Sequence, residues 1–161
     1  MMLPIHTLWR RGLLAIALAV LAVGSLAPVA RADSSFHSER IPLMSVSGTP
    51  LQSGFVVDIH TNGPTVYALE RYVLNGAEPN TTYSVVSQVY LDPTCGSNFF
   101  GAIPDATLQT NVAGNGEASN IIRPDLITEF GLHNTTLGIV WQVWSGETLA
   151  YQTSCISVPL D

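Results

Sequence analysis

The tripeptide Asp58-Ile59-His60 is the best local candidate for chemistry in the sequence. Residues two apart on a β-strand point to the same side, so a carboxylate and an imidazole would converge there. Both groups are common metal ligands, and a third ligand would have to come from elsewhere, with His133 and Glu70 as candidates. Asp58 and His60 therefore predict either a metal site or a polar pair on a solvated strand face.

Nucleophilic catalysis is a second possibility, and the sequence gives it little support. There is no G-x-S-x-G elbow, so His37, His60 or His133 would reach a serine only through the fold. Twelve acidic residues allow a carboxylate pair for glycoside cleavage, but none stands in an apolar setting that would raise its pKa. We expect a non-enzymatic protein without a cofactor, and keep a small secreted hydrolase as an alternative.

Two tryptophans lie three residues apart and so point to opposite sides of a predicted strand. Trp141 is expected in the core. Trp144 shares the other face with Gln142, beside the turn Ser145-Gly146. Exposed aromatic side chains at the rim of a sandwich often contact sugars or proteins. Trp144 and Gln142 are therefore predicted to bind a ligand, with ordinary packing as the alternative.

The two cysteines, Cys95 and Cys155, allow one pairing in an oxidising compartment. They form no C-x-x-C motif, so a structural disulfide is favoured over a redox or metal-binding thiol pair. We predict a Cys95–Cys155 disulfide.

The first 32 residues have the organisation of a secretory signal peptide. Arg10 and Arg11 precede an apolar run that ends at Leu26, and Ala30-Arg31-Ala32 matches a signal peptidase site. Cleavage is predicted between Ala32 and Asp33, by Sec or twin-arginine export. An uncleaved anchor is the alternative, but the apolar run is shorter than the about 20 residues that a membrane span needs.

Cleavage would leave three arginines against twelve acidic residues, and the chain contains no lysine. Such a surface repels nucleic acid and anionic membranes, so neither is expected as a partner. It favours cations or basic partners, although acidity also simply promotes solubility.

Apolar stretches alternate with turn signals at spacings near ten residues from Ile41 onward, which is typical of antiparallel sandwiches and barrels. The expected strands cover 41–47, 54–61, 65–74, 82–91, 106–112, 117–122, 135–144 and 147–158. The Gly114-Asn115-Gly116 turn predicts that the fifth and sixth strands form a hairpin. A short helix is expected after Pro124. Residues 33–161 are thus predicted to be one all-β domain, an antiparallel Ig-like sandwich of about eight strands.

Short motifs in the second half of the chain resemble those of small secreted bacterial β-sandwich proteins of unassigned function. They are Leu74-Asn75-Gly76, residues 79–83, 92–95, 110–116, 137–141 and 151–155. Residues 79–83 are also similar to a turn and strand of fibronectin type III domains, and residues 110–116 to a hairpin of CHRD domains. The resemblance implies a compact sandwich and no particular activity.

These observations predict a secreted or periplasmic protein that acts as an interaction or structural module. Its expected partner is an extracellular protein or a polysaccharide, and no membrane contact is expected after signal cleavage. A metal-binding protein using Asp58 and His60 is the main alternative.

Overall fold

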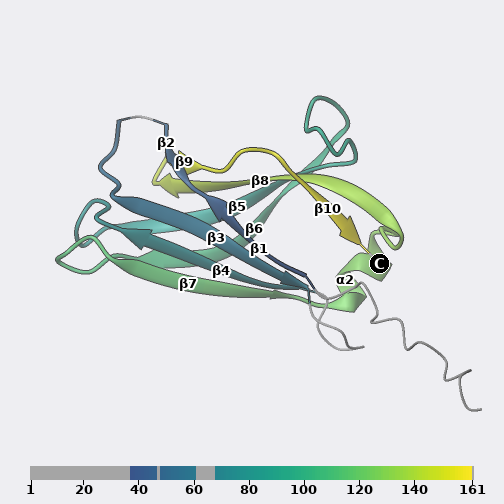
Figure 1. Ribbon diagram of the computed structural model, residues 1–161, viewed down its shortest axis with the longest axis horizontal. Coiled ribbons are helices and arrows are strands. Elements are labelled where there is room, and N and C mark those ends of the chain that lie inside the picture. Colours follow the sequence, from purple (N-terminus) through teal and green to yellow (C-terminus); the bar gives the residue numbers. More distant parts are fainter. Residues whose placement is uncertain (1–36, 47, 61–67, 161) are drawn as a thin grey trace, which may run out of the picture. The chain divides into compact units, whose positions relative to one another are not determined.

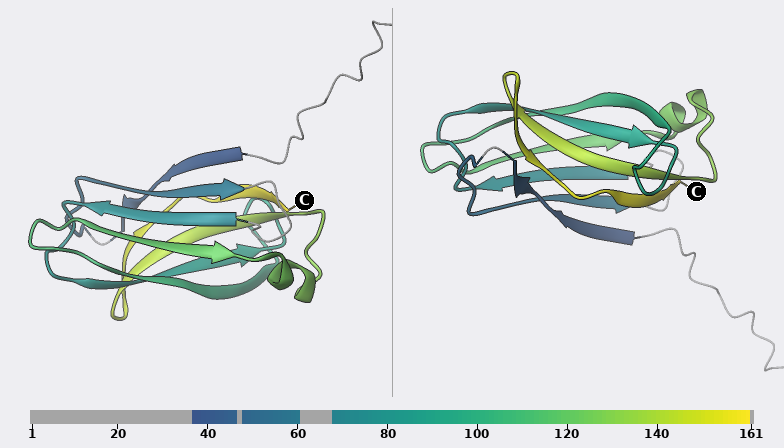
Figure 2. Two further views of the ribbon diagram at one scale, coloured as in Figure 1. Left: turned by 90° about the horizontal axis from the view of Figure 1, so that it is seen from below. Right: turned by 90° about the horizontal axis from the view of Figure 1, so that it is seen from above.

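The computed structural model describes residues 37–46, 48–60 and 68–160, which belong to one compact unit. Two antiparallel sheets pack face to face (Figures 1 and 2). The first sheet has the order β1 (His37–Pro42), β3 (Ser53–His60), β4 (Ala68–Asn75), β7 (Gly116–Ile122). The second has the order β2 (Met44–Ser45), β9 (Thr148–Gln152), β8 (Thr135–Ser145), β5 (Thr82–Tyr90), β6 (Phe99–Gln109), and β10 (Ile156–Leu160) also pairs with β8. The predicted all-β antiparallel sandwich is confirmed.

Alternating burial along the strands explains why they form two packed layers. Every second residue of β3, β4 and β5 is buried, which is the period of a strand with one face on a core. The largest side chains in that core are fully buried aromatics: Trp141, Tyr72, Tyr83 and Tyr151. Trp141 is therefore a core residue, as predicted.

The inward face of the central strands changes from apolar to polar along its length. On β3, buried Val56 is followed by buried Asp58 and His60, and on β4 buried Tyr72 is preceded by buried Glu70. Asp58 and Glu70 are directly opposite each other in the β3–β4 register. The polar end of this face coincides with the end of the sandwich where the short helix α2 (Pro124–Glu129) lies.

Several strand boundaries differ from the prediction. The first strand, expected from Ile41, begins at His37, because its backbone pairs with β3 from His37 to Pro42. The predicted last strand, 147–158, is two strands, β9 and β10, which pair with different parts of β8. The strand expected over 106–112 is longer and begins at Phe99, as β6.

The predicted hairpin of residues 106–112 and 117–122 is wrong. The turn exists, and Asn111 Oδ1 accepts hydrogen bonds from the amides of Ala113 and Asn115. However, β6 pairs with β5 in one sheet, and β7 pairs with β4 in the other. The turn therefore carries the chain between the two sheets, because local turn chemistry does not determine which strand each arm finds as its partner.

The disulfide between Cys95 and Cys155 is confirmed, with the two Cα atoms 6.0 Å apart. It joins the β5–β6 loop to the segment between β9 and β10. Under this loop lies Gly138 of β8. A Cβ at Gly138 would stand 2.4 Å from the carbonyl oxygen of Asp92 and 2.8 Å from Cys95 Sγ. The disulfide loop thus packs directly on a strand position that has room for glycine alone.

We expect Gly138→Ala to lower the free energy of unfolding by about 2 kcal/mol or more, since the added methyl overlaps backbone that the disulfide holds in place. Urea unfolding would measure this. Gly101→Ala is the matched control, because a Cβ there meets no atom within 4 Å. Equal midpoints for the two variants would contradict this view of the loop.

The predicted signal peptide and its cleavage site at Ala32 and Asp33 lie outside the described residues. Among the residues that the structure does describe, no helix has the length and hydropathy needed to span a membrane.

Candidate functional site

A cavity of about 460 Å³ lies between the two sheets, at the end of the sandwich near α2. One wall comes from β3, β4 and β7, and the other from β5, β6, β8 and β10, while α2 and the residues after it contribute Leu126, Ile127, Phe130 and Leu132. A volume of this size is within the range of sites for small organic ligands.

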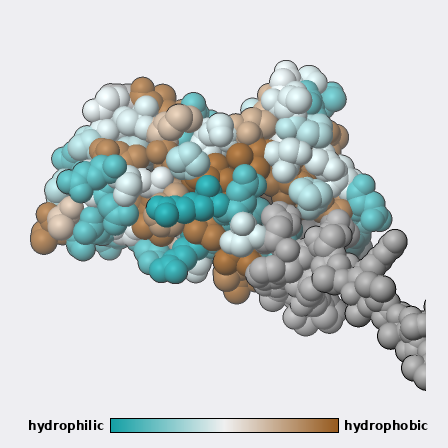
Figure 3. All heavy atoms as spheres, viewed as in Figure 1, coloured by the Kyte–Doolittle hydropathy of each residue, from teal (hydrophilic) through white to brown (hydrophobic). Residues whose placement is uncertain are grey.

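Apolar side chains form the exposed rim of the cavity. Five large apolar residues line it while remaining between 38% and 54% exposed: Phe100, Ile103, Ile121, Leu126 and Phe130. Phe100 and Phe130 meet edge to face, with ring centroids 5.7 Å apart. More generally, one face of the protein shows hydrophobic atoms between hydrophilic side chains (Figure 3). Exposed apolar side chains gathered around a cavity are typical of a ligand-binding site.

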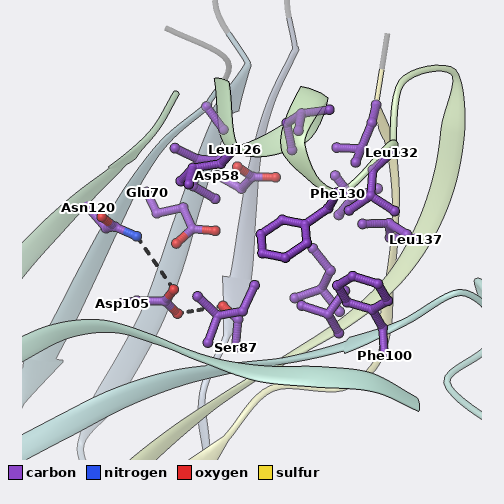
Figure 4. A pocket seen from close by; sticks show the side chains of 18 of the residues that line it. Asp58, Glu70, Ser87, Phe100, Asp105, Asn120, Leu126, Phe130, Leu132 and Leu137 are labelled. Atoms are coloured by element: carbon purple, nitrogen blue, oxygen red, sulfur yellow. Dashed lines mark hydrogen bonds between the residues drawn. The ribbon is translucent and has the colours of Figure 1, made fainter. Parts of the chain in front are cut away.

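Acidic side chains occupy the opposite side of the cavity from these aromatic rings (Figure 4). Asp58 and His60 form a buried pair, with His60 Nε2 and Asp58 Oδ2 2.9 Å apart. The other carboxylate oxygen, Asp58 Oδ1, is buried and has no hydrogen-bond partner among the described residues. A buried carboxylate oxygen without a partner is energetically costly, so Asp58 keeps an unused acceptor beside the cavity.

Glu70 is the most deeply buried acid, with 1% of its surface exposed. Trp141 Nε1 donates to Glu70 Oε1 at 3.2 Å, and the Tyr72 hydroxyl donates to Oε2. Burial, followed by the nearby negative charges of Asp105 and Asp58, raises the pKa of Glu70 to about 8, even though the two hydrogen bonds lower it. Glu70 therefore holds a proton at neutral pH while the cavity contains no cation.

Asp105 is the third acid of the cavity, and it comes from the opposite sheet. Its Oδ2 accepts a hydrogen bond from Ser87 Oγ at 2.5 Å, and its Oδ1 accepts a long one from Asn120 Nδ2 at 3.5 Å (Figure 4). Burial raises the pKa of Asp105 and the hydrogen bond from Ser87 lowers it. The net effect is a pKa raised to about 6. The prediction that no acidic residue lies in an apolar setting is thus wrong for Glu70 and for Asp105.

Two β-bulges in β6 account for the inward position of Asp105 and Phe100. In the β5–β6 register, Val85 faces Ala106 and Val86 faces Pro104, so Asp105 has no partner across the strands. Val89 faces Gly101 and Tyr90 faces Phe99, so Phe100 is likewise the extra residue. Bulges reorient individual side chains beside functional sites. Simple alternation would therefore not have placed Asp105 and Phe100, which lie on opposite sides of the cavity (Figure 4).

Of the four sequence-predicted metal residues, the structure pairs Asp58 with His60, places Glu70 next to them and separates His133. Asp58 and His60 are buried inside the sandwich, so the solvated polar pair is wrong. Glu70 lies beside Asp58, whereas His133 is exposed and bonds Thr128 Oγ1 at 2.8 Å. In the described part of the chain, no three His, Cys, Asp or Glu side chains are arranged to hold a metal ion. The metal hypothesis thus retains two ligands and stays a prediction.

The predicted ligand residues Trp144 and Gln142 lie half-buried on the outward face of β8 and do not line the cavity. Their role stays a prediction. For the hydrolase alternative, the serine that lines the cavity, Ser87, directs its hydroxyl proton to Asp105. A nucleophilic serine would instead donate to a general base such as histidine.

Comparison with protein-family models, with curated proteins and with solved structures gave no match.

Proposed function

We propose that the chain is an extracytoplasmic, non-enzymatic binding protein that holds a small, largely apolar ligand between its two sheets. The observation that carries this proposal is the cavity of about 460 Å³, whose apolar rim remains exposed. A core that needed only stability would be closely packed, since voids of this size lose dispersion contacts and destabilise the fold.

The disulfide and the first 32 residues support a location outside the cytoplasm. Structural disulfides are rare in reducing compartments, and Met1–Ala32 matches the pattern of a cleaved signal peptide. The excess of acidic residues makes nucleic acid an unsuitable partner. A small molecule taken up from the extracellular medium or the periplasm fits all three observations.

Native mass spectrometry and the neutral dye Nile red test this proposal. We expect protein purified from its export compartment to carry an organic adduct, and protein stripped of that adduct to bind Nile red with increased fluorescence. Ala102→Trp should abolish both, because Ala102 lines the rim of the cavity. Thr107→Trp is the matched control on the same strand, at an exposed position outside the lining. Nile red binding that is equal in the two variants would contradict the proposal.

A further inference from the structure

The acidic side of the cavity holds more carboxyl groups than basic side chains of the protein. Three carboxyl groups line it, those of Asp58, Glu70 and Asp105, and His60 is the one basic side chain among the lining residues. The chain has no lysine. Buried acids without a positive partner are expensive, so this side of the cavity favours a cation from outside.

The three described arginines are occupied elsewhere. Arg71 pairs with Glu117 at 2.6 Å on the surface, and Arg123 lies 3.5 Å from Asp125. The guanidinium of Arg40 stacks on the ring of Phe55 at 3.7 Å from its centroid. None of them lines the cavity, so none neutralises the acids there.

The unpartnered oxygen of Asp58 is independent evidence for a missing donor. Asp58 is 3% exposed and lines the cavity, and its Oδ1 has no hydrogen bond. A carboxylate offers about four acceptor positions, so Glu70 and Asp105 also keep capacity beyond the bonds they already accept. The carboxyl groups of Asp58, Glu70 and Asp105 all line this cavity, so an ammonium group that enters it has carboxyl oxygens to which its N–H groups can donate.

From this arrangement we infer that the ligand is an amphipathic amine. Its ammonium group binds Asp58, Glu70 and Asp105, and its apolar body contacts Phe100, Phe130 and the aliphatic side chains of the other wall. The inference rests on the proposed binding function and adds the chemical class of the ligand. Charge-assisted hydrogen bonds in a site of low dielectric are strong enough to select an ammonium over a hydroxyl group.

Binding of this kind is linked to pH. The titratable side chains that face the ammonium are Asp58 and His60 from β3, Glu70 from β4 and Asp105 from β6, while β5 and β7 present Ser87 and Asn120. Burial raises the pKa of Asp105 to about 6, so protonation of Asp105 below that pH removes negative charge from this side of the cavity. We therefore expect amine affinity to rise at least tenfold from pH 5 to pH 8.

A matched series of eight-carbon compounds tests the inference by isothermal titration calorimetry at pH 8. We expect n-octylamine to bind at least tenfold more tightly than 1-octanol, with octanoate the weakest of the three. Asp58→Asn replaces the unpartnered oxygen, and Glu70→Gln removes the deepest acid without changing its shape. Each should weaken octylamine binding at least tenfold and change octanol binding by less than about twofold.

The control is Glu147→Gln, which removes one exposed negative charge in the β8–β9 turn, away from the cavity. It should leave octylamine affinity unchanged. If Glu147→Gln weakened binding as much as Glu70→Gln, the attraction would be one of general surface charge and the inference would be overturned. It would also be overturned if EDTA abolished octylamine binding, because a metal ion would then mediate it.

The series separates the two proposals. Octanol binding as tight as octylamine binding would overturn the amine inference and leave the apolar binding function intact. Failure of all three compounds and of Nile red to bind would overturn both.

Discussion

The melting temperature of the protein will fall by more than about 10 °C between pH 5 and pH 8.5. The cause is Glu70, whose pKa is raised by burial from 4.5 to about 8. Between those two values the folded state retains a proton that the unfolded chain has released. Stability therefore decreases as the pH rises through this window, and the loss is complete above pH 8, at a cost on the order of 5 kcal/mol. Asp105, with a pKa raised to about 6, acts in the same direction.

Replacing Glu70 with glutamine should remove most of this pH dependence. The amide oxygen can still accept from Trp141, and the amide nitrogen can donate to the Tyr72 oxygen. E70Q should thus have about the same melting temperature as the unmodified protein at pH 5 and a much higher melting temperature at pH 8.5. Differential scanning calorimetry across this range measures both values.

E147Q serves again as the control, since it removes an exposed carboxylate and should leave the slope unchanged. Asp92 and Glu117 have lowered pKa values, caused by hydrogen bonds from Thr94 and from Arg71, so they titrate below the chosen range. If E70Q lost stability with pH as steeply as the unmodified protein, Glu70 would not be the group that titrates.

Removal of the disulfide is the second large effect that we expect. The bond between Cys95 and Cys155 closes a loop with a sequence separation of 60 residues. The entropy lost by the unfolded chain in closing such a loop corresponds to about 4 kcal/mol of stability. The double variant Cys95→Ala, Cys155→Ala should therefore unfold at a much lower urea concentration.

Reduction of the unmodified protein gives an independent measurement of the same quantity. Dithiothreitol should lower the urea midpoint to about that of the double variant, and both should show a larger m-value because the unfolded chain is more expanded. A midpoint that reduction leaves in place would show that the disulfide does not stabilise the fold.

The sequence was sufficient for the fold class, the disulfide and the facing of most strands. In the expected strand 82–91, alternation puts Tyr83, Val85, Ser87, Val89 and Leu91 on one face. The first four are buried in β5, whereas Leu91 follows the end of the strand and is 45% exposed. Alternation is informative there because one face of the strand meets the core. Strand pairing was harder to predict. The turn at residues 111–115 has the same local chemistry whether the two strands that it connects lie in one sheet or in different sheets, and β6 and β7 lie in different sheets.

The candidate site could be predicted in part. The prediction that Asp58 and His60 share one face of a strand is confirmed, whereas the alternative that this face is solvated is wrong, since both side chains are buried. Alternation puts Asp58 on the same face of β3 as the apolar Val56, and Glu70 on the same face of β4 as Tyr72. The sequence pattern could therefore have predicted that both acids are buried. Alternation could not have predicted that Asp105 points into the cavity, since its orientation depends on a bulge. Pro104 within a strand was the available signal, because proline is confined to edge strands and bulges.

The irregular β6 also has a consequence for how the protein behaves when many copies are present. β6 is the last strand of its sheet, so its outer backbone groups have no strand beside them in the described part of the fold. A long, flat outer strand recruits strands of other molecules and begins intermolecular aggregation. In β6 the two bulges break the regular spacing of those groups, and Pro104 has no N–H to offer. The same irregularities that turn Phe100 and Asp105 toward the cavity thus make this edge a poor template for another molecule, and they favour a protein that stays monomeric at high concentration.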